Sequence, residues 1–485
     1  MNKSLIISTT GGLLLFLALA MLLPLLVAGY YGNREELRAF LYSAVVTAAA
    51  GALMKFPFQK KDTEFTIREG FVCVVLGWTV CVLFGSLPYQ LTGSIKGFTD
   101  AYFESMSGFT TTGATVIKAV ESLTPGIVLW RGFTQWLGGL GIVVFFIAFL
   151  PTAGLAAHHL FAAEFPGPTA DRIRPRIAET ARLLLKIYIL LSLLEILLLL
   201  LGGMPAFDTL CHTFSTVSTG GFSSKDASIA SYQSLYIEVV ISVFMFLGAC
   251  NFVLYYQAGK GKVGHVLRNP ELRFFALLVS IIIFLVALSL HSSATGAVEG
   301  KSFPGALRRA AFQVLSIATT TGFTTEDFDK WPDFCRFALI LMMLVGGCAG
   351  STAGAIKNIR ILLLLKCTGR ELVRLVTPRV VKHVKISGVS VEEDVISNAF
   401  GFFFLYLGLF GLFSLILSAL GIDIVTAFGA VAATMGNVGP GLGGVGPGLN
   451  YGHLDLMEKW VLIFCMLLGR LEIYSVILMF MFLRR

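Results

Sequence analysis

A short run of threonine and glycine occurs four times in this chain, each time between apolar segments. The copies are Ser107–Gly113, Ser215–Gly220, Ala318–Gly322 and, in degenerate form, Met435–Gly439. Their last glycines, Gly113, Gly220, Gly322 and Gly439, are separated by 107, 102 and 117 residues. Four similar hairpins in one chain can close around one axis. A single axis of this kind predicts a pore.

The composition places these hairpins in a membrane. Of the 485 residues, 56% are hydrophobic and only 14% are charged, whereas a soluble domain carries about 25% charged residues. The formal net charge is +8, but most Lys and Arg lie in short loops at 55–68, 172–186, 260–273 and 357–385. This favours a cytoplasmic side for those loops over nucleic-acid binding, and it puts the four turns toward the outside.

The apolar segments divide the chain into a leading pair and four units. A transmembrane helix needs about 20 apolar residues, and spans at about 4–31 and 37–56 form an N-terminal region, 1–67. Each unit then consists of a span, a short re-entrant helix, a turn and a second span. We expect the units at 68–152, 178–258, 271–366 and 393–485. The predicted fold is an all-α, multi-pass membrane protein with four helix–pore-helix–filter–helix units around a pseudo-fourfold pore.

The four turns have the chemistry of a cation filter. Irregular backbone at membrane depth is tolerated only where protein buries it or where it lines a water-filled path. Rings of backbone carbonyls can replace the hydration shell of a cation, and glycine adopts positive φ at little cost. Ordinary extracellular turns are the alternative, but those favour Asn, Asp, Pro and Ser. The predicted filter residues are Thr111, Thr112, Gly113, Thr219, Gly220, Thr320, Thr321, Gly322, Asn437, Val438 and Gly439.

Each short helix would point its partially negative C-terminal end at the axis, which favours a cation. Asp100, Asp208 and Asp423 lie near the starts of three of these helices, where we expect them to act as caps rather than as ion ligands. The third unit has Arg308 and Arg309 near that position instead, and the sequence offers no reason for this.

Five blocks of sequence resemble the TrkH-type potassium-uptake subunits of the Trk/Ktr/HKT superfamily. They are Phe103–Thr115, Gln135–Ile142, Gly346–Gly354, Gly436–Gly443 and Gly469–Tyr474. The resemblance implies a pseudo-fourfold pore, two extra N-terminal helices, a homodimer and a cytoplasmic, nucleotide-binding ring partner of the TrkA kind. In that superfamily, a serine in place of the first filter glycine accompanies sodium preference. Glycine in all four copies here therefore implies potassium as the transported ion.

Two features after the turns are candidates for a gate. The second helix of the third unit is interrupted by a glycine-rich run containing Gly346, Gly347, Gly350 and Gly354, followed by Lys357. Close helix packing through small residues is one explanation. The density of glycine and the family resemblance favour a mobile loop that plugs the pore beneath the filter, with Lys357 near the cytoplasmic entrance.

Arg470 and Glu472 lie within the last apolar span. Intramembrane charges are costly and face the interior of a bundle. An internal ion pair that holds helices together is one interpretation. In the other, which the resemblance supports, Arg470 projects into the pore and adds an electrostatic barrier below the filter.

Other function classes find little support in the sequence. The GxGxxG match at Gly439–Gly444 has no βαβ context, no Walker lysine motif is present, and the eight cysteines contain no CxxC pair. We expect no enzyme activity and no disulfide or zinc framework. The leading hypothesis is potassium uptake across the bacterial inner membrane. The alternatives are a proton- or sodium-coupled symporter, a less selective potassium and sodium channel, and a scaffold that recruits the cytoplasmic partner.

Overall fold

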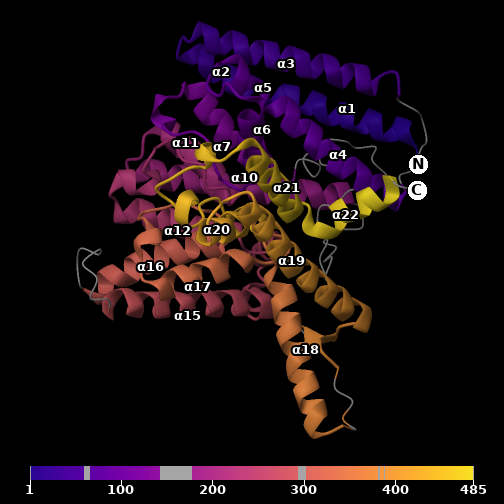
Figure 1. Cartoon of the computed structure of the whole chain (residues 1–485), viewed down its shortest axis with the longest axis vertical. Helices are drawn as coiled ribbons and strands as arrows, with labels where there is room; N and C mark the ends of the chain where they lie inside the picture. The colour runs from indigo at the N-terminus through magenta and orange to yellow at the C-terminus, as the bar shows by residue number, and fades with distance from the viewer. Residues whose placement is uncertain are drawn as a thin grey trace.

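The computed structural model describes residues 2–58, 66–141, 177–292, 302–378, 380, 383–386 and 388–483. The predicted end of the first unit at 152 and parts of the basic loops 172–186 and 55–68 lie outside these residues. The described chain is a bundle of helices with a single two-stranded hairpin (Figure 1).

The N-terminal region is a helical hairpin against one side of the bundle. It consists of α1 (Lys3–Ala20), α2 (Leu22–Tyr30) and α3 (Arg34–Lys55). The two predicted spans correspond to the helical segments Lys3–Tyr30 and Arg34–Lys55, which are long and apolar enough to cross a membrane. A Cβ atom at Gly11 would lie 2.7 Å from the carbonyl oxygen of Gly51, so small residues let the two backbones approach closely.

Four times the chain repeats the order of a long helix, a short helix, a turn and a second helix. The long helices are α4 (Ile67–Gly85), α10 (Ile177–Leu201), α15 (Pro270–Ser292) and α19 (Glu393–Ala419). The short helices are α6 (Phe98–Phe109), α11 (Ala206–Val217), α16 (Phe303–Ala318) and α20 (Ile424–Met435). The second helices are α7 (Pro125–Gly139), α12 (Leu235–Gly248), α17 (Asp333–Leu344) and α21 (Leu456–Arg470).

The helices of the four units form a closed ring. Each short helix packs against the second helix of its own unit and against the second helix of the preceding unit: α11 packs on α12 and α7, α16 on α17 and α12, and α20 on α21 and α17. The ring closes because α6 packs on α7 and on α21, the second helix of the last unit. This cyclic order agrees with the arrangement that the repeated turns predict.

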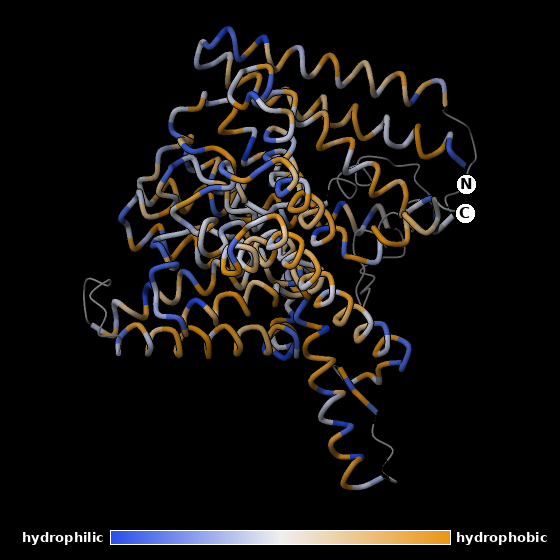
Figure 2. Tube along the Cα trace, viewed as in Figure 1, coloured by the Kyte–Doolittle hydropathy of each residue, from blue (hydrophilic) through white to orange (hydrophobic). Residues whose placement is uncertain are grey.

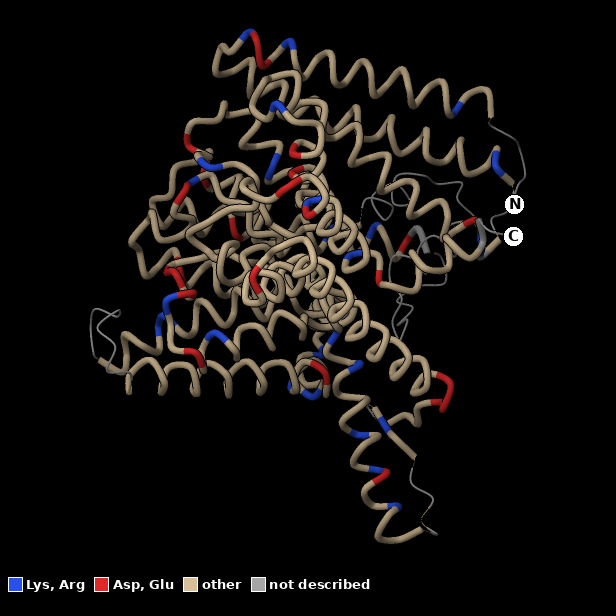
Figure 3. The backbone as a smooth tube through the Cα atoms, viewed as in Figure 1, with Lys and Arg blue, Asp and Glu red and all other residues tan. Residues whose placement is uncertain are grey.

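Smaller elements join these helices. They are α5 (Leu87–Leu91), η1 (Val120–Ser122), η2 (Ser228–Tyr232), α13 (Phe252–Gly259), α14 (Val263–Leu267), η3 (Phe328–Lys330), α18 (Asn358–Val376), β1 (Lys385–Ile386), β2 (Val389–Ser390), η4 (Gly443–Val445), η5 (Tyr451–His453) and α22 (Glu472–Leu483). Strands β1 and β2 pair antiparallel. Helix α18 extends away from the bundle (Figure 1), and Figure 3 shows several Lys and Arg residues along it.

The second helices do not run straight through the bundle. The sequence predicted an interruption only in the third unit, where α17 ends at Leu344 and α18 begins at Asn358. That interruption is confirmed, and the structure adds bends in the second and fourth units that the sequence did not predict. Helices α12 and α13 meet at 97°, and α21 and α22 meet at 110°. On the two sides of the last bend, Arg470 and Glu472 contact different neighbours. Such tertiary contacts cannot be read from an apolar pattern.

The hydrophobic surface is that of a membrane protein. Six described helices are long and apolar enough to cross a bilayer, or up to eight if each bent pair counts as one span. Figure 2 shows apolar residues along the outer helices α1, α3 and α15. All eight cysteines are buried and free.

Candidate pore: a ring of four turns and the loop beneath it

The four turns share one backbone conformation. In each, a residue other than glycine adopts positive φ: Thr111 at 53°, Thr219 at 54°, Thr320 at 57° and Asn437 at 53°. Two residues later comes a glycine with positive φ: Gly113 at 81°, Gly221 at 78°, Gly322 at 82° and Gly439 at 102°. Left-handed conformations are unusual outside glycine. They persist only where the surrounding structure enforces them, so four copies indicate a shared constraint.

The residue between these two positions makes the same hydrogen bond in every turn. Its backbone N–H donates to the carbonyl five residues earlier: Thr112 to Ser107 at 2.9 Å, Gly220 to Ser215 at 2.8 Å, Thr321 to Ser316 at 2.9 Å and Val438 to Ala433 at 2.8 Å. Each accepting residue lies in the last turns of a short helix. The C-terminal end of every short helix is therefore tied directly to its turn.

This geometry changes the alignment of the second turn. The sequence pattern predicts Gly220 as the equivalent of Gly113. In the structure Gly220 occupies the position of Thr112, and Gly221 has the positive φ that Gly113 has in the first turn. Two adjacent glycines leave the register open when glycines alone are counted. The signal that resolves it is the phenylalanine that follows the last glycine in two turns, in Gly221-Phe222 and Gly322-Phe323.

The glycines bring the turns together into a ring. A Cβ atom at each would lie less than 3.0 Å from a carbonyl oxygen of the next turn: Gly113 from Gly220, Gly221 from Thr321, Gly322 from Val438 and Gly439 from Thr112. Real Cβ atoms do not make such contacts. The fourth turn thus meets the first, and glycine is required both by its φ and by the close approach of backbones.

An open cavity of about 160 Å³ lies over this ring. All four of these glycines line it, together with segments that follow the turns. The predicted residues of the four turns are thus adjacent in space, with Gly221 added to them.

Polar side chains on three short helices brace the segments that follow the turns. They occupy one position, seven residues before the left-handed residue. Glu104 accepts hydrogen bonds from Thr115 Oγ1 at 3.0 Å and from Val116 N at 3.0 Å. His212 Nε2 lies 3.0 Å from Ser223 Oγ. The Gln313 carboxamide contacts Thr325 Oγ1 at 3.2 Å, whereas the fourth unit has Ala430 there.

Arg309, for which the sequence offers no reason, forms an ion pair whose two charges are exchanged relative to the equivalent pair in the second unit. In the second unit Asp208 on the short helix lies 4.0 Å from Lys225, which follows the turn. In the third unit the equivalent positions carry Arg309 and Glu326, 3.6 Å apart. The pairing of charges is thus kept while the signs are exchanged. The neighbouring Arg308 pairs across the unit boundary with Glu238 of α12, at 2.8 Å.

The expectation that the three aspartates cap their helices holds for one of them. Asp423 is the N-cap of α20 and accepts from Thr426 N. Hydrogen bonds from the side chain and the backbone of Thr426 hold the pKa of Asp423 below its usual value. Asp100 and Asp208 lie inside the first turn and make no cap bond. Asp100 instead pairs with Lys459 of α21 at 2.7 Å.

The glycine-rich loop of the third unit lies directly against the ring of turns. Thr352 Oγ1 lies 3.2 Å from Thr219 Oγ1, and Gly354 N donates to Thr320 Oγ1 at 2.8 Å. A Cβ atom at Gly354 would lie 2.8 Å from the Cβ of Asn437. The loop therefore touches the left-handed residues of three turns.

The loop is also held from its sides. A Cβ atom at Gly347 would lie 2.7 Å from the carbonyl oxygen of Ala249, at the bend between α12 and α13. Gly350 has φ of 70°, and its carbonyl accepts from Phe252 N at 3.1 Å. The backbone of Gly346 accepts from the Asn358 side chain. Glycine is needed here for close contacts between backbones, so helix packing through small residues does not describe this segment.

Arg470 connects the loop to the remaining turn. Its guanidinium donates to Thr111 Oγ1 at 3.1 Å, to Thr352 O at 2.8 Å and to Gly139 O at 2.6 Å. Its contacts thus include the first turn, the loop and the end of α7.

The other two predicted charges of this region face different partners. Glu472 pairs with Arg360 of α18, and the guanidinium carbon of Arg360 lies 4.0 Å from the ring centre of Phe402. Lys357 donates to the carbonyl of Ala353 within the loop. The expected internal pairing of Glu472 thus involves Arg360.

Known proteins resemble this chain over nearly its whole length. A family model described as TrkH, a cation transport protein, matches residues 36–484. The Trk system potassium uptake protein TrkH of Halomonas elongata is 42% identical over 483 residues, which cover 99% of this chain and 98% of that protein. Its namesake in Escherichia coli K12 is 40% identical over 475 residues, covering 97% and 96%. The crystal structure of the potassium transporter TrkH from Vibrio parahaemolyticus superimposes with a TM-score of 0.86 at 40% identity, and 98% of each chain is covered.

Proposed function

Because this chain belongs to the TrkH family of cation transport proteins, we propose that it takes up potassium through the ring of four turns. The observation that carries the proposal is the ring itself, in which each turn glycine packs against a carbonyl of the next turn. Backbone oxygens gathered in this way can substitute for the hydration shell of a monovalent cation. The names of the relatives, which are potassium uptake proteins, support potassium as that ion.

The short helices supply the electrostatics. The C-terminal ends of α6, α11, α16 and α20 are tied to the four turns, and each end carries a partial negative charge. Four such ends stabilise a cation in the ring and disfavour an anion. The membrane potential provides about 2.3 kcal/mol per charge per 100 mV, which drives uptake through a passive path.

The loop beneath the ring acts as a gate in this proposal. Its contacts with Thr219 and Thr320, together with the bridge from Arg470 to Thr111, support a position across the path below the filter. Ion flow then requires the loop to move aside. Arg470 adds positive charge at the same level, which slows conduction by repelling a cation.

The remaining expectations concern assembly and location. We place the protein in the bacterial inner membrane, as a homodimer that binds a TrkA-like nucleotide-binding subunit on the cytoplasmic side. The relatives are named as parts of a Trk system, which supports such a partner. Crosslinking in membranes tests the dimer, and co-purification with a candidate TrkA-like subunit tests the partner.

The function is tested by uptake. The gene should restore growth of a potassium-uptake-deficient bacterial strain at low potassium, and proteoliposomes should take up Rb⁺ in preference to Na⁺. No uptake would leave the scaffold hypothesis, and equal Rb⁺ and Na⁺ flux would indicate a poorly selective channel. Flux measured with and without a pH or sodium gradient distinguishes passive uptake from a coupled symporter.

A further inference from the structure

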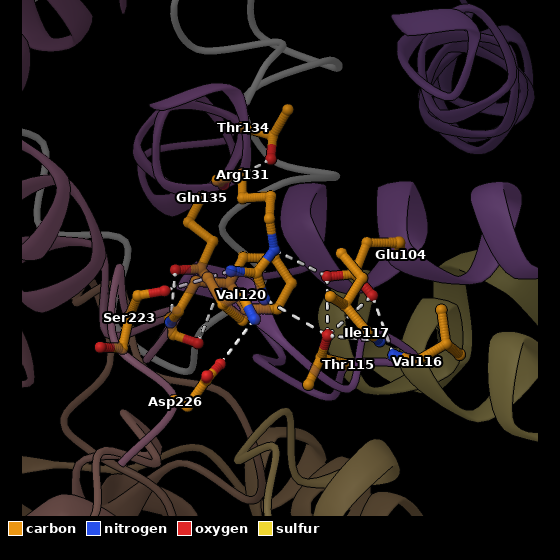
Figure 4. A network of polar contacts seen from close by, with 12 residues as sticks. Glu104, Thr115, Val116, Ile117, Val120, Arg131, Thr134, Gln135, Ser223 and Asp226 are labelled. Atoms are coloured by element: carbon orange, nitrogen blue, oxygen red, sulfur yellow. Dashed lines mark hydrogen bonds and ion pairs between the residues drawn. The ribbon is translucent and has the colours of Figure 1, made fainter. Parts of the chain in front are cut away.

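Two side chains on α7 reach from the first unit into the turn of the second. Arg131 and Gln135 are four residues apart on this helix, so they lie on the same helix face. Figure 4 shows both side chains directed into one polar network, with Glu104 on the far side of Arg131. Neither residue belongs to a turn, yet together they contact the segment that follows the first turn and the backbone of the second.

Arg131 is held by a buried ion pair behind the first turn. Its Nε lies 2.9 Å from Glu104 Oε1, and the two side chains are only 2% and 0% exposed. The Glu104 carboxylate also accepts from Thr115 and Val116, just after the first turn. Because a buried charge is costly unless it is paired, these groups are fixed relative to one another.

From this anchored position Arg131 extends to the second unit. Its guanidinium donates to Ser223 O at 3.1 Å, and its central carbon lies 4.1 Å from the centre of the Phe222 ring. A planar guanidinium over an aromatic face is attracted to it. One side chain thus fixes the distance between the segments that follow two neighbouring turns.

Gln135 hydrogen-bonds to the backbone on both sides of Gly221, the ring glycine of the second turn. Its Nε2 donates to Gly220 O at 2.6 Å, and its Oε1 accepts from Phe222 N at 3.0 Å. These partners fix the orientation of the amide, since a carbonyl only accepts and a backbone N–H only donates. Gly221, with its positive φ, lies between the two contacts. Gln135 therefore clamps the backbone on either side of a ring glycine.

The carbonyl in this clamp is one that closes the ring. Gly220 O is the oxygen that a Cβ atom at Gly113 would meet. The boundary between the first and second turns is therefore set by side chains of α7 as well as by the turns. We propose that Arg131 and Gln135 are positioning residues that set the ion selectivity of the pore by fixing the second turn against the first.

The proposal rests on the function proposed above, and Gln135 provides its sharpest test. Gln135→Leu removes both hydrogen bonds at similar volume. Gln135→Glu is isosteric, keeps the acceptor for Phe222 N and loses the donor to Gly220 O. Uptake of Rb⁺ and Na⁺ into proteoliposomes should show a Rb⁺ over Na⁺ preference that falls by about tenfold in each variant. Na⁺ flux should be maintained or increased, which a structural defect alone would not produce.

The ion pair is tested in parallel. Arg131→Lys retains a cation for Glu104 but cannot reproduce the contact with Ser223 and the stacking on Phe222, so it should keep thermal stability and lose selectivity. The matched control is Arg308→Lys, in the bidentate pair with Glu238 between α16 and α12, which touches no turn and should leave the preference unchanged.

The outcomes separate the two proposals. If the unaltered protein shows no Rb⁺ preference, the proposed function fails, whatever the variants do. If it does show the preference and the folded Gln135→Glu and Arg131→Lys variants keep it within about twofold, the positioning role is overturned. A parallel loss of Rb⁺ and Na⁺ flux in all variants would assign both residues to stability alone, and so would overturn it as well. If Gln135→Leu fails to fold, the isosteric Gln135→Glu decides the result.

Discussion

The contact between the glycine-rich loop and the ring can be weakened by removing one hydroxyl group. Thr352 Oγ1 lies 3.0 Å from Gly248 O and 3.1 Å from Val217 O, and it accepts from Thr219 Oγ1 at 3.2 Å. Thr352→Val keeps the branched shape and loses these interactions. The single hydroxyl hydrogen donates one hydrogen bond at a time, so the side chain makes one donated and one accepted bond. With about 0.5–1.5 kcal/mol for each, the loop should lose about 1–3 kcal/mol of stabilisation beneath the turns. The displaced state should then become roughly 5- to 150-fold more populated.

Rb⁺ uptake into proteoliposomes measures this change. If displacement of the loop limits conduction, the initial rate should rise in the variant while the preference for Rb⁺ over Na⁺ stays the same. Thr79→Val is the matched control, because the Thr79 hydroxyl donates to Val75 O in its own helix. Deletion of 346–354 should raise the rate further. An unchanged or lower rate in both the Thr352 variant and the deletion would refute the gate.

Three further outcomes follow from the site. Arg470→Ala should conduct at least about tenfold faster, because a unit charge about 6 Å from the ion costs about 3 kcal/mol at an effective dielectric constant of about 20; slower flux would make the residue structural. Gly221→Ala should abolish selective Rb⁺ uptake, whereas Gly203→Ala, at a φ of 81° with open space around it, should cost stability only; equal uptake defects would argue against the ring. Arg309→Asp should reduce the free energy of unfolding by up to about 1 kcal/mol and so lower the melting temperature, and adding Glu326→Lys should restore the melting temperature. A double variant no more stable than the single one would show that the charges do not pair.

The cyclic arrangement could be predicted from the sequence because the repeat carries it. Four segments that share a helix, a turn and a final glycine have few ways to bury their polar turns in a bilayer other than around a common axis. The interruption at Gly346–Gly354 was also visible, since four glycines in nine residues are incompatible with a stable helix interior. Both features can be predicted from the residue types within a short stretch of sequence.

The register of the second turn and the bends in two helices were not visible in this way. Ser218-Thr-Gly-Gly221 offers two glycines, and counting glycines does not decide between them. The positive φ of Gly221 and the hydrogen bond from Gly220 N to Ser215 O do. The bend after Arg470 depends on contacts with Gly139 and Arg360, which are far away in the chain. Tertiary contacts overrode an apolar pattern that reads as a continuous helix.

The buried charges behind the turns were also beyond sequence reasoning. Glu104 lies in one of the blocks that carry the family resemblance, but its partner Arg131 is 27 residues away on another helix. Charge pairs between helices leave no periodic signal. A search for charged residues at equivalent offsets from the four turns would have found the reversed pair Arg309 and Glu326 in the third unit.

The most direct test of the ring is to locate the ion. Crystals of the protein grown in Rb⁺ and measured at the rubidium absorption edge should show anomalous density between Gly113, Gly221, Gly322 and Gly439, and Na⁺ should not displace it at equal concentration. Rubidium density elsewhere in the protein, with none between the four turns, would contradict the central claim.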